Sequence, residues 1–267
     1  MTTRSTDAVP TISVVIPCLN DASMLAQCLA ALAAQTTPPF EVIVVDGGST
    51  DDSRRVAVAA GARVLTATGG IPAASAAGLD AARGEVIGRL DADSRPSPDW
   101  LQRVSDDLSS DTHWSAVTGT GEFYDTGRLL AWAGRVLYLG GYFHVVGPIL
   151  GHPPLFGSNF AILREEWSRL SAHVHRNGMD IHDDLDFSIQ LAPDMTVLYD
   201  RALRVGVSGR QLGSWSSLRR HVVWSANTFA LNRKQLPQRT RRRLRRLRRR
   251  QSRVTDGPAP SDTIPSE

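Results

Sequence analysis

Residues 11–46 of the chain read TISVVIPCLNDASMLAQCLAALAAQTTPPFEVIVVD. Both ends of this stretch, Thr11–Pro17 and Glu41–Asp46, are short, apolar and rich in β-branched residues, which predicts two buried strands. Between them, apolar side chains recur at helical spacing behind a capping Asn20 or Asp21, and these are Leu25, Cys28, Leu29 and Leu32. A strand, a helix and a second strand in this order predict a parallel sheet.

The same alternation continues to about residue 108. We expect strands at 62–67 and 85–91, and helices from Asp51 to Gly61, from Pro72 to Gly84 and over 99–108. Sheets of this kind carry helices on both faces and bind ligands beyond the carboxyl ends of their strands. The sequence therefore predicts that Asn20, Asp46 and Asp91, which follow or end three strands, meet at one edge of the sheet.

The pattern after Thr118 is less regular. Strands are expected at 157–163, 196–199 and 203–207, and helices at 182–192 and 214–234. Residues 129–150 are apolar and aromatic, but they are interrupted by charged residues, glycines and a proline. They are too broken to span a bilayer, so a buried or interfacial helix is favoured.

Asp91-Ala92-Asp93 places two carboxylates two residues apart in a loop, an arrangement that can hold Mg²⁺ or Mn²⁺. Such triplets are common by chance, and a second one occurs at Asp184-Leu185-Asp186. The position of the first at the end of an apolar strand favours a metal site over a solvated acidic turn.

Three stretches, in this order, resemble the donor half of a family-two glycosyltransferase: VVIPCLND (14–21), VVDGGSTD (44–51) and ARGEVI (82–87) running into LDAD (90–93). The similarity extends more loosely to about Trp224. It implies an α/β fold of the GT-A type, a Rossmann-like doubly wound, mainly parallel sheet with an attached acceptor subregion. It also implies an inverting enzyme that moves one sugar from a nucleotide-diphosphate sugar to a hydroxyl acceptor.

The resemblance assigns roles to residues of the first half. Pro17, Leu19 and Asn20 would line the nucleotide pocket, and Asp46 would accept a hydrogen bond from the base or its surroundings. Asp91 would lie near the ribose and the metal. Asp93 would bind the Mn²⁺ or Mg²⁺ that bridges the diphosphate. A UDP-sugar is the donor that the family favours. For Asn20 and Asp46, capping or turn formation is the alternative.

The second half would supply the base and the acceptor side. Residues 182–187, HDDLDF, resemble the family's acidic pair and the apolar helix that follows it. Asp184 then corresponds to the general base, and the like charges of Asp183 and Asp186 would raise its proton affinity. The alternative is that these acids only complement a helix dipole.

Gly157-Ser158-Asn159 resembles the family's glycine-rich acceptor strand, so these three residues and Asp183 are predicted to bind the acceptor. The alternative is a strand with a tolerated glycine. His182 and His221 are candidates to complete the metal shell.

The sequence also departs from the family pattern. Ser75-Ala76-Ala77 stands where an Arg-Asn pair is common, and Gly47 stands in place of a second Asp after Asp46. Residues 211–215, QLGSW, carry Ser214 where processive synthases have arginine. Transfer of one sugar is therefore favoured over polymerisation.

The net charge of +3 hides an asymmetry. Residues 233–253 hold twelve Lys or Arg and no acid, so the rest of the chain carries a formal charge of −9. An anionic membrane surface is the favoured partner of this arginine-rich tail, since each cation near anionic lipid contributes about 1 kcal/mol. A solvated tail without a partner is an alternative, and nucleic acid is disfavoured because few aromatic residues interleave with the charges. The acceptor would then be lipid-linked, and residues 132–143 would add an interfacial anchor.

These features predict four regions: a flexible N-terminus (1–10), a nucleotide-sugar-binding half (11–120), an acceptor-binding and catalytic-base half (121–235) and an arginine-rich, disordered tail (236–267). The absence of a signal-peptide pattern and two expected free thiols, Cys18 and Cys28, favour a cytoplasmic protein, peripheral on the inner face of the membrane.

The sequence also bears on three other classes of protein. A dinucleotide-dependent oxidoreductase is disfavoured because no Gly-x-Gly-x-x-Gly follows the first strand. A metal-dependent nucleotidyltransferase would use similar acids but would release pyrophosphate. A non-catalytic membrane or nucleic-acid binding protein on a GT-A scaffold would not depend on Asp93 or Asp184.

Overall fold

The computed structural model of the chain describes residues 9–109, 112–134, 136, 140–178, 180–211, 215–234 and 236. Its strands are β1 (Ile12–Cys18), β2 (Glu41–Asp46), β3 (Arg63–Thr66), β4 (Val86–Arg89), β5 (Arg95–Pro96), β6 (Ala116–Phe123), β7 (Phe160–Leu163) and β8 (Val197–Val207). Its helices are α1 (Ala22–Ala33), α2 (Ser53–Ala59), α3 (Ile71–Ala81), α4 (Trp100–Asp107), α5 (Arg128–Ala133), α6 (Gly147–Leu150), α7 (Arg164–Leu170), α8 (Asp183–Gln190) and α9 (Trp215–Leu231). A π-helical turn, η2 (Tyr142–Val146), precedes α6, and a 3-10 turn, η3 (Gly209–Gln211), follows β8.

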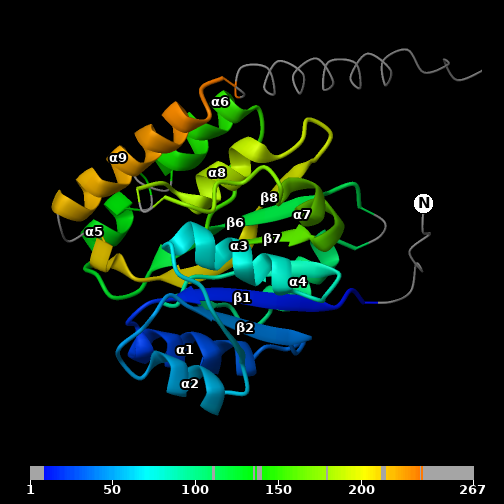
Figure 1. Cartoon of the computed structure of the whole chain (residues 1–267), viewed down its shortest axis with the longest axis vertical. Helices are drawn as coiled ribbons and strands as arrows, with labels where there is room; N and C mark the ends of the chain where they lie inside the picture. The colour runs from blue at the N-terminus through cyan, green and yellow to red at the C-terminus, as the bar shows by residue number, and fades with distance from the viewer. Residues whose placement is uncertain are drawn as a thin grey trace, which may run out of the picture.

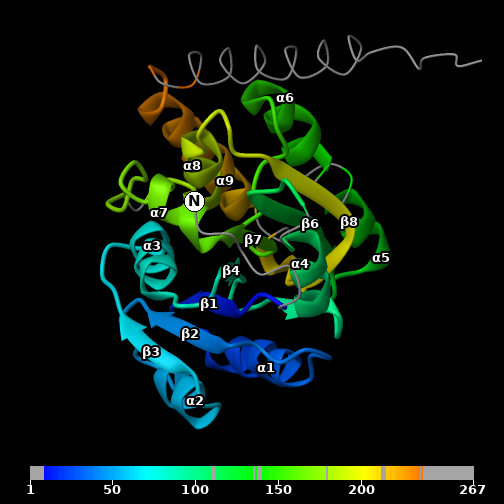
Figure 2. The same cartoon turned by 90° about the vertical axis from the view of Figure 1, so that its right-hand side faces the viewer.

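All eight strands form one sheet in the order β3-β2-β1-β4-β7-β6-β8-β5 (Figures 1 and 2). The first four neighbours, β3, β2, β1 and β4, are parallel, with Ile16 of β1 opposite Val44 of β2. The predicted parallel sheet is therefore confirmed for this half. The carboxyl ends of these strands lie at one edge, where the predicted site residues follow them.

The rest of the sheet is mixed. β7 runs antiparallel to both β4 and β6, while β6 and β8 are parallel to one another. The two short strands predicted at 196–199 and 203–207 are both present, but they are parts of the single strand β8 (Val197–Val207). Its pairing with β6 shifts between Thr118, opposite Tyr199, and Thr120, opposite Arg204, so the intervening residues bulge and the sequence pattern breaks there.

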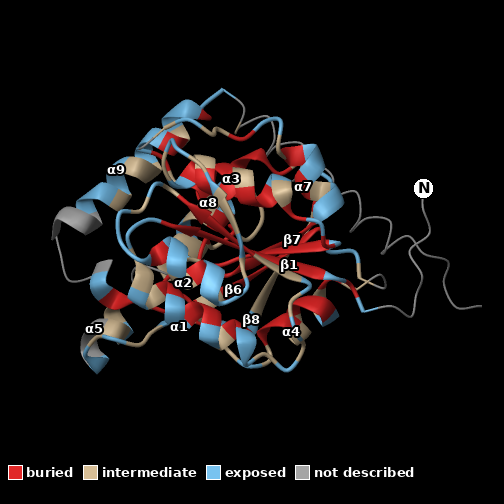
Figure 3. Ribbon diagram, turned by 60° about the horizontal axis from the view of Figure 1, so that its bottom comes forward, coloured by how far each residue is buried: buried red, intermediate tan, exposed pale blue. Residues whose placement is uncertain are grey.

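The two faces of the sheet carry separate cores, and Figure 3 shows the buried strands between the helix layers. Successive residues of β1 point to opposite faces. Val14 and Ile16 belong to the core that α1, α2 and α4 cover, and Val15 belongs to the core that α3, α7 and α8 cover. The four apolar residues predicted for the first helix are the buried residues of α1.

The stretch predicted as one buried or interfacial helix is divided into α5, η2 and α6 within its described part. Leu150 of α6 packs with Leu185 and Ile189 of α8, and Phe229 of α9 lies against the same cluster. No helix in the described ranges combines the length and apolar character needed to cross a membrane.

The predicted boundary at residue 120 falls inside β6, so the two predicted halves share one sheet. Most of the arginine-rich tail, from residue 237 onward, lies outside the described residues, as do residues 1–8 and 212–214.

Candidate active site

The loops after β1 and β2 form a hydrogen-bonded pair at the carboxyl edge of the sheet. Asp46 is buried, and its Oδ1 accepts a hydrogen bond from the Ser49 N–H at 2.9 Å. Asn20 has a left-handed φ of 52°, and its Oδ1 accepts from the Thr50 N–H at 2.8 Å. Both side chains thus shape these loops, and the turn-forming role that was the alternative for them is present in the structure.

The two other residues predicted for the nucleotide pocket flank these loops. Pro17 is buried in β1, opposite Val45 of β2. Leu19 is 58% exposed and lies against Gly47, with its Cβ 3.5 Å from where a Cβ on that glycine would stand.

Asp93 is a buried carboxylate with a cationic neighbour. Arg210 of η3 reaches across the site, and its Nη2 lies 3.3 Å from Asp93 Oδ2 while its Nη1 donates to Asp21 at 3.0 Å. Burial and the like charge of Asp91 raise the pKa of Asp93 to about 7, although Arg210 opposes this shift. A cation bound near Asp93 would therefore stabilise the ionised form of this carboxyl group.

Arg89, at the end of β4, joins the two halves of the site. Its side chain is only 2% exposed. Its Nη1 donates to Asp91 at 2.6 Å and its Nη2 to Asp183 at 3.1 Å. Ser75 of α3 also donates to Asp183, at 2.5 Å. Asp183 is therefore occupied by internal partners, and its carboxylate is buried.

Asp184, the predicted base, lies at the start of α8. Its Oδ2 accepts from the Gly157 N–H at 2.9 Å, and its Oδ1 accepts from the Leu185 N–H at 2.7 Å. Burial raises the pKa of Asp184, and the like charge of Asp183 adds to this shift, while His182 and Arg89 oppose it. A carboxylate with raised proton affinity is suited to accept a proton from a hydroxyl group.

Gly157 and Ser158 lie between the two acid groups. A Cβ at Gly157 would stand 2.8 Å from Arg89 Nη1 and 3.0 Å from Asp184 Oδ2, so a larger residue would displace one of these two charged groups. The Ser158 hydroxyl donates a hydrogen bond to Asp91 Oδ2. These contacts connect the metal-binding acids predicted in the first half with the base predicted in the second.

The side chain of Asn159, the third residue of the predicted acceptor strand, lies in the core. It is fully buried, its Oδ1 accepts from the Trp100 indole at 2.8 Å, and its Nδ2 donates to the carbonyls of Thr120 and Leu203. These bonds tie the start of β7 to α4, β6 and β8, so the side chain serves packing in this structure.

Asp186 lies within α8, His182 directly precedes this helix, and His221 lies in α9. Asp186 is turned away from the site, because its Oδ1 contacts His175 Nδ1 at 2.8 Å and it accepts from Asn232 at 2.9 Å. His182 and His221 stack with their ring centroids 5.1 Å apart. Burial and the neighbouring His182 lower the pKa of His221 to about 4, so this ring is neutral at physiological pH.

Three residues of the site, Arg89, Arg210 and Ser75, were not predicted from the sequence. Only Arg89 carried a usable signal, since a charged residue within the apolar stretch 86–90 requires a buried partner. Ser75 stands where the family's Arg-Asn pair was expected, and it contacts Asp183 instead.

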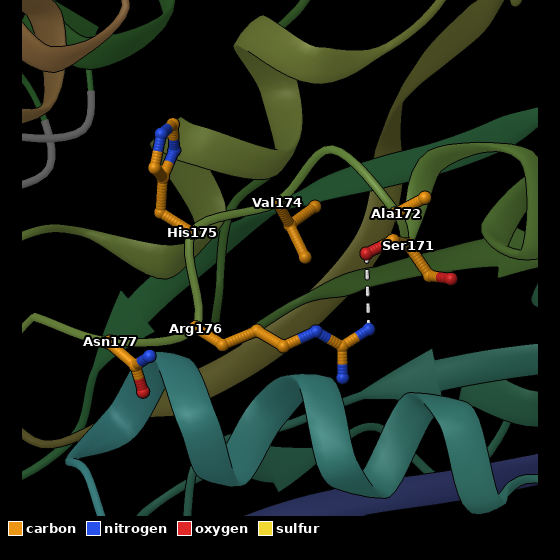
Figure 4. A pocket seen from close by; sticks show the side chains of 6 residues that line it. All are labelled: Ser171, Ala172, Val174, His175, Arg176 and Asn177. Atoms are coloured by element: carbon orange, nitrogen blue, oxygen red, sulfur yellow. Dashed lines mark hydrogen bonds between the residues drawn. The ribbon is translucent and has the colours of Figure 1, made fainter.

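A separate pocket lies on the segment after α7 (Figure 4). Its lining residues are Ser171, Ala172, Val174, His175, Arg176 and Asn177. Arg176 crosses it and donates to the Ser171 carbonyl at 3.1 Å. None of the predicted site residues lines this pocket.

The described residues contain no cluster of three or more His, Cys, Asp or Glu side chains around one point. The site has two acids, Asp91 and Asp93, close to one another. Mg²⁺ sites commonly use one or two carboxylates, with the remaining ligands supplied by water and substrate phosphates. The residues present therefore fit a cation that is completed by a diphosphate.

The mixed sheet, with acids at the carboxyl edge of its parallel half and an acidic helix start facing them, is the architecture of GT-A proteins. The chain belongs to glycosyl transferase family 2, whose sequence profile matches residues 13–168.

Several relatives are similar to parts of the chain. Glycosyltransferase AglE of Haloferax volcanii is 32% identical over 127 residues, which are 44% of this chain and 41% of that protein. A PGL/p-HBAD biosynthesis glycosyltransferase of Mycobacterium tuberculosis is 48% identical over 50 residues, 19% of this chain and 20% of that protein. The matched segments thus span less than half of each curated relative.

A solved structure covers more of the chain. Glucosyl-3-phosphoglycerate synthase from Mycobacterium tuberculosis, in complex with Mn²⁺, UDP and glucosyl-3-phosphoglycerate, superposes with a TM-score of 0.55. The two proteins are 25% identical, and the match covers 74% of this chain and 71% of that one.

Proposed function

We propose that the chain is a glycosyltransferase that moves one sugar from a nucleotide-diphosphate sugar to a hydroxyl acceptor with inversion. The observation that carries this proposal is the link between two kinds of acid in one site. Asp91 and Asp93 offer ligands for a cation, and Asp184, whose pKa is raised, faces them through Gly157 and Arg89.

The donor is a UDP-sugar in this proposal. Pro17, Leu19, Asn20 and Asp46 would hold its nucleoside at the ends of β1 and β2. The synthase from Mycobacterium tuberculosis, with the same fold and 25% identity, binds Mn²⁺ and UDP, which supports both a uridine nucleotide and a divalent cation for this chain.

Asp93 and Asp91 would hold the Mn²⁺ or Mg²⁺. The raised pKa of Asp93 supports this assignment, because a cation beside a buried carboxylate favours its ionised form. When bound, the cation supplies charge stabilisation for the leaving diphosphate. Arg210 lies on the same carboxylate and adds a second positive charge on that side.

Asp184 would act as the general base. It takes the proton of the acceptor hydroxyl while that oxygen forms a bond to the anomeric carbon and the bond to the diphosphate breaks. Attack from the face opposite the leaving group inverts the configuration. The Gly157 N–H holds the carboxylate in place, and Ser158, bonded to Asp91, would line the acceptor side with Asp183 behind it.

The acceptor would be lipid-linked, and the chain would work as a peripheral protein on the inner face of the membrane. The twelve cations of residues 233–253 support this proposal, since they carry no compensating acid. Nucleic acid is the weaker candidate for the tail, because those residues include no aromatic side chain.

Thermal unfolding with UDP, GDP, CDP and ADP, each with and without Mn²⁺, tests the donor site. We expect one nucleotide, UDP, to raise the Tm in a Mn²⁺-dependent manner, and Asp93→Asn to remove that dependence. Stabilisation by none of them would contradict the proposal, and pyrophosphate release from UTP would favour a nucleotidyltransferase.

The base is tested separately with Asp184→Asn. We expect sugar transfer to fall by about a hundredfold or more, the range for loss of a general base, while UDP still raises the Tm. The exposed Asp194→Asn is the matched control and should transfer normally. Full activity of Asp184→Asn would contradict its assignment.

A further inference from the structure

Two polar side chains near the end of helix α9 face the protein. Thr228, in the last turn of the helix, and Asn232, directly after its end, are both fully buried. The Thr228 hydroxyl accepts from the His182 N–H at 3.0 Å, and Asn232 donates to Asp186 of α8 at 2.9 Å. The inner face of this helix is thus held by hydrogen bonds to the segment that carries the proposed base.

The outer face of α9 carries several apolar side chains, with the exposed Asn227 among them. Val222 is 66% exposed, Val223 44% and Leu231 52%, and Ala226 and Ala230 are exposed between them. Spacings of three and four residues place these side chains on one side of a helix. A surface helix usually turns such a stripe inward, so an exposed stripe of this kind calls for a partner.

The neighbouring segment continues this surface. Val145 of η2 is 63% exposed and Ile149 of α6 is 44% exposed. The two segments lie side by side in Figures 1 and 2, and Phe229 of α9 packs against the cluster that holds Leu150. Seven of the thirteen exposed large apolar side chains among the described residues lie within 132–149 and 222–231. Such concentration marks an interaction surface.

Cations stand at both ends of the apolar stripe. Arg219 and Arg220 are exposed at its start, and Arg233 and Lys234 are exposed at its end. The helix Trp215–Leu231 contains no acid, and the arginine-rich sequence follows it directly. An apolar stripe with cationic ends is the composition of helices that lie in the interface of anionic membranes.

We infer that the outer face of α9, together with η2 and α6, docks on the surface of an anionic lipid bilayer. A second copy of the chain fits this face less well. Because a two-fold interface sets the surface against itself, parallel or antiparallel helices would both bring cationic ends together. Phospholipid headgroups supply the opposite charge, and the acyl chains cover the valines and Leu231.

Docking would place the acceptor side of the site near the lipid headgroups. His182, two residues before Asp184, contacts the His221 carbonyl of α9 at 3.2 Å. This part of the inference rests on the proposed function, and it gives a lipid-linked acceptor a short path to the base. The docking itself does not depend on any catalytic activity.

Co-sedimentation of the full chain with vesicles tests the docking. Vesicles of phosphatidylcholine alone are compared with vesicles that contain one third phosphatidylglycerol. We expect binding to the anionic vesicles, and a loss of about tenfold or more in the double variant Val222→Asp, Val223→Asp, since its valines no longer insert. Val58→Asp, at a valine of α2 that is 61% exposed, is the control and should bind as the parent chain does.

A chain that ends after Lys234 separates the helix from the tail. We expect this chain to bind more weakly than the full one but to remain sensitive to Leu231→Asp. Unchanged binding of the Val222 and Val223 double variant would overturn the inference, because the tail alone would then account for it. Tighter vesicle binding by the truncated chain would also overturn it, since the tail would then cover this face.

Sedimentation velocity tests the alternative that this face binds a second copy of the chain. A dimer that dissociates in the double variant, with no change in vesicle binding, would assign the face to a second copy and overturn the inference. The Mn²⁺-dependent effect of UDP on the Tm, measured on the same variants, reports the donor site independently. Failure of docking and failure of the proposed function are therefore distinguishable.

Discussion

A single buried guanidinium, that of Arg89, holds the acids of both halves of the site together. It contacts Asp91 after β4 and Asp183 at the start of α8, and it lies within reach of the charge of Asp184. A buried cation is tolerated only where carboxylates surround it. The buried carboxylates of this site likewise need the positive charge of Arg89.

Replacement of Arg89 by Met should therefore destabilise the protein strongly. It leaves buried carboxylates without their counter-charge, and we expect the free energy of unfolding to fall by about 3–5 kcal/mol, as measured by urea unfolding. Arg55→Met removes an exposed ion pair with Asp52 and should leave the stability nearly unchanged. Equal stability of the two variants would show that Arg89 is not needed to balance the acids.

The proton affinity of Asp184 offers a second test at this scale. A base works in its ionised form, so the rate of transfer should rise with pH through the raised pKa of Asp184. Asp183→Asn removes a like charge and should lower that pKa. We expect the acid limb of the kcat profile to move to lower pH, with Glu122→Gln as an exposed control. A limb that stays in place would exclude Asp183 as a cause of the shift.

At the scale of elements, α3 lies unusually close to the parallel strands. A Cβ on Gly78 would stand 2.3 Å from Val15 Cγ1 and 2.8 Å from Val45 Cγ2, so the helix approaches through its missing side chain.

Gly78→Ala should consequently force α3 away from β1 and β2. We expect a loss of about 1–3 kcal/mol of unfolding free energy, typical of overpacked cores, measured by urea unfolding. A Cβ on Gly127 meets nothing within 4 Å, so Gly127→Ala is the control and should change stability by about 0.5 kcal/mol or less. Equal free energies of unfolding for the two variants would show that the close approach of α3 does not contribute to stability.

The elements also differ in how far the sequence determines them. Each strand and helix of the parallel half carries its own local signals, and the site residues Asn20, Asp46 and Asp91 were predictable because they follow those strands. β6 was not predicted, since its sequence AVTGTGEF lacks an alternating apolar pattern and it forms through pairing with β7 and β8. Arg210 was missed for a related reason, because its partner Asp21 lies 189 residues away.

At the scale of the whole molecule, stability should depend on pH through Asp107 at the end of α4. Its Oδ2 is buried and lacks a hydrogen-bond partner among the described residues. Burial and the like charges of Asp200 and Asp106 raise the pKa of Asp107 to about 6.

Between about pH 4, the pKa of an unfolded aspartate, and about pH 6, the folded chain retains a proton that the unfolded chain has lost. This group therefore lowers the stability as the pH rises through that window. Asp107→Asn should remove the loss, with a gain of about 1–2 kcal/mol at pH 8 and little change at pH 4. Urea unfolding at the two pH values measures it, and a gain that is equal at both would exclude titration as the cause.

β7 lies between β4 and β6, so the sheet is complete only when segments from both halves of the chain are present. A fragment that stops near residue 120 would keep β4 but leave its row of N–H and C=O groups open along an apolar strand, which invites aggregation. The nucleotide-binding half is therefore not an independently folding domain. New acceptor preferences are better engineered by grafting loops between relatives than by exchanging halves.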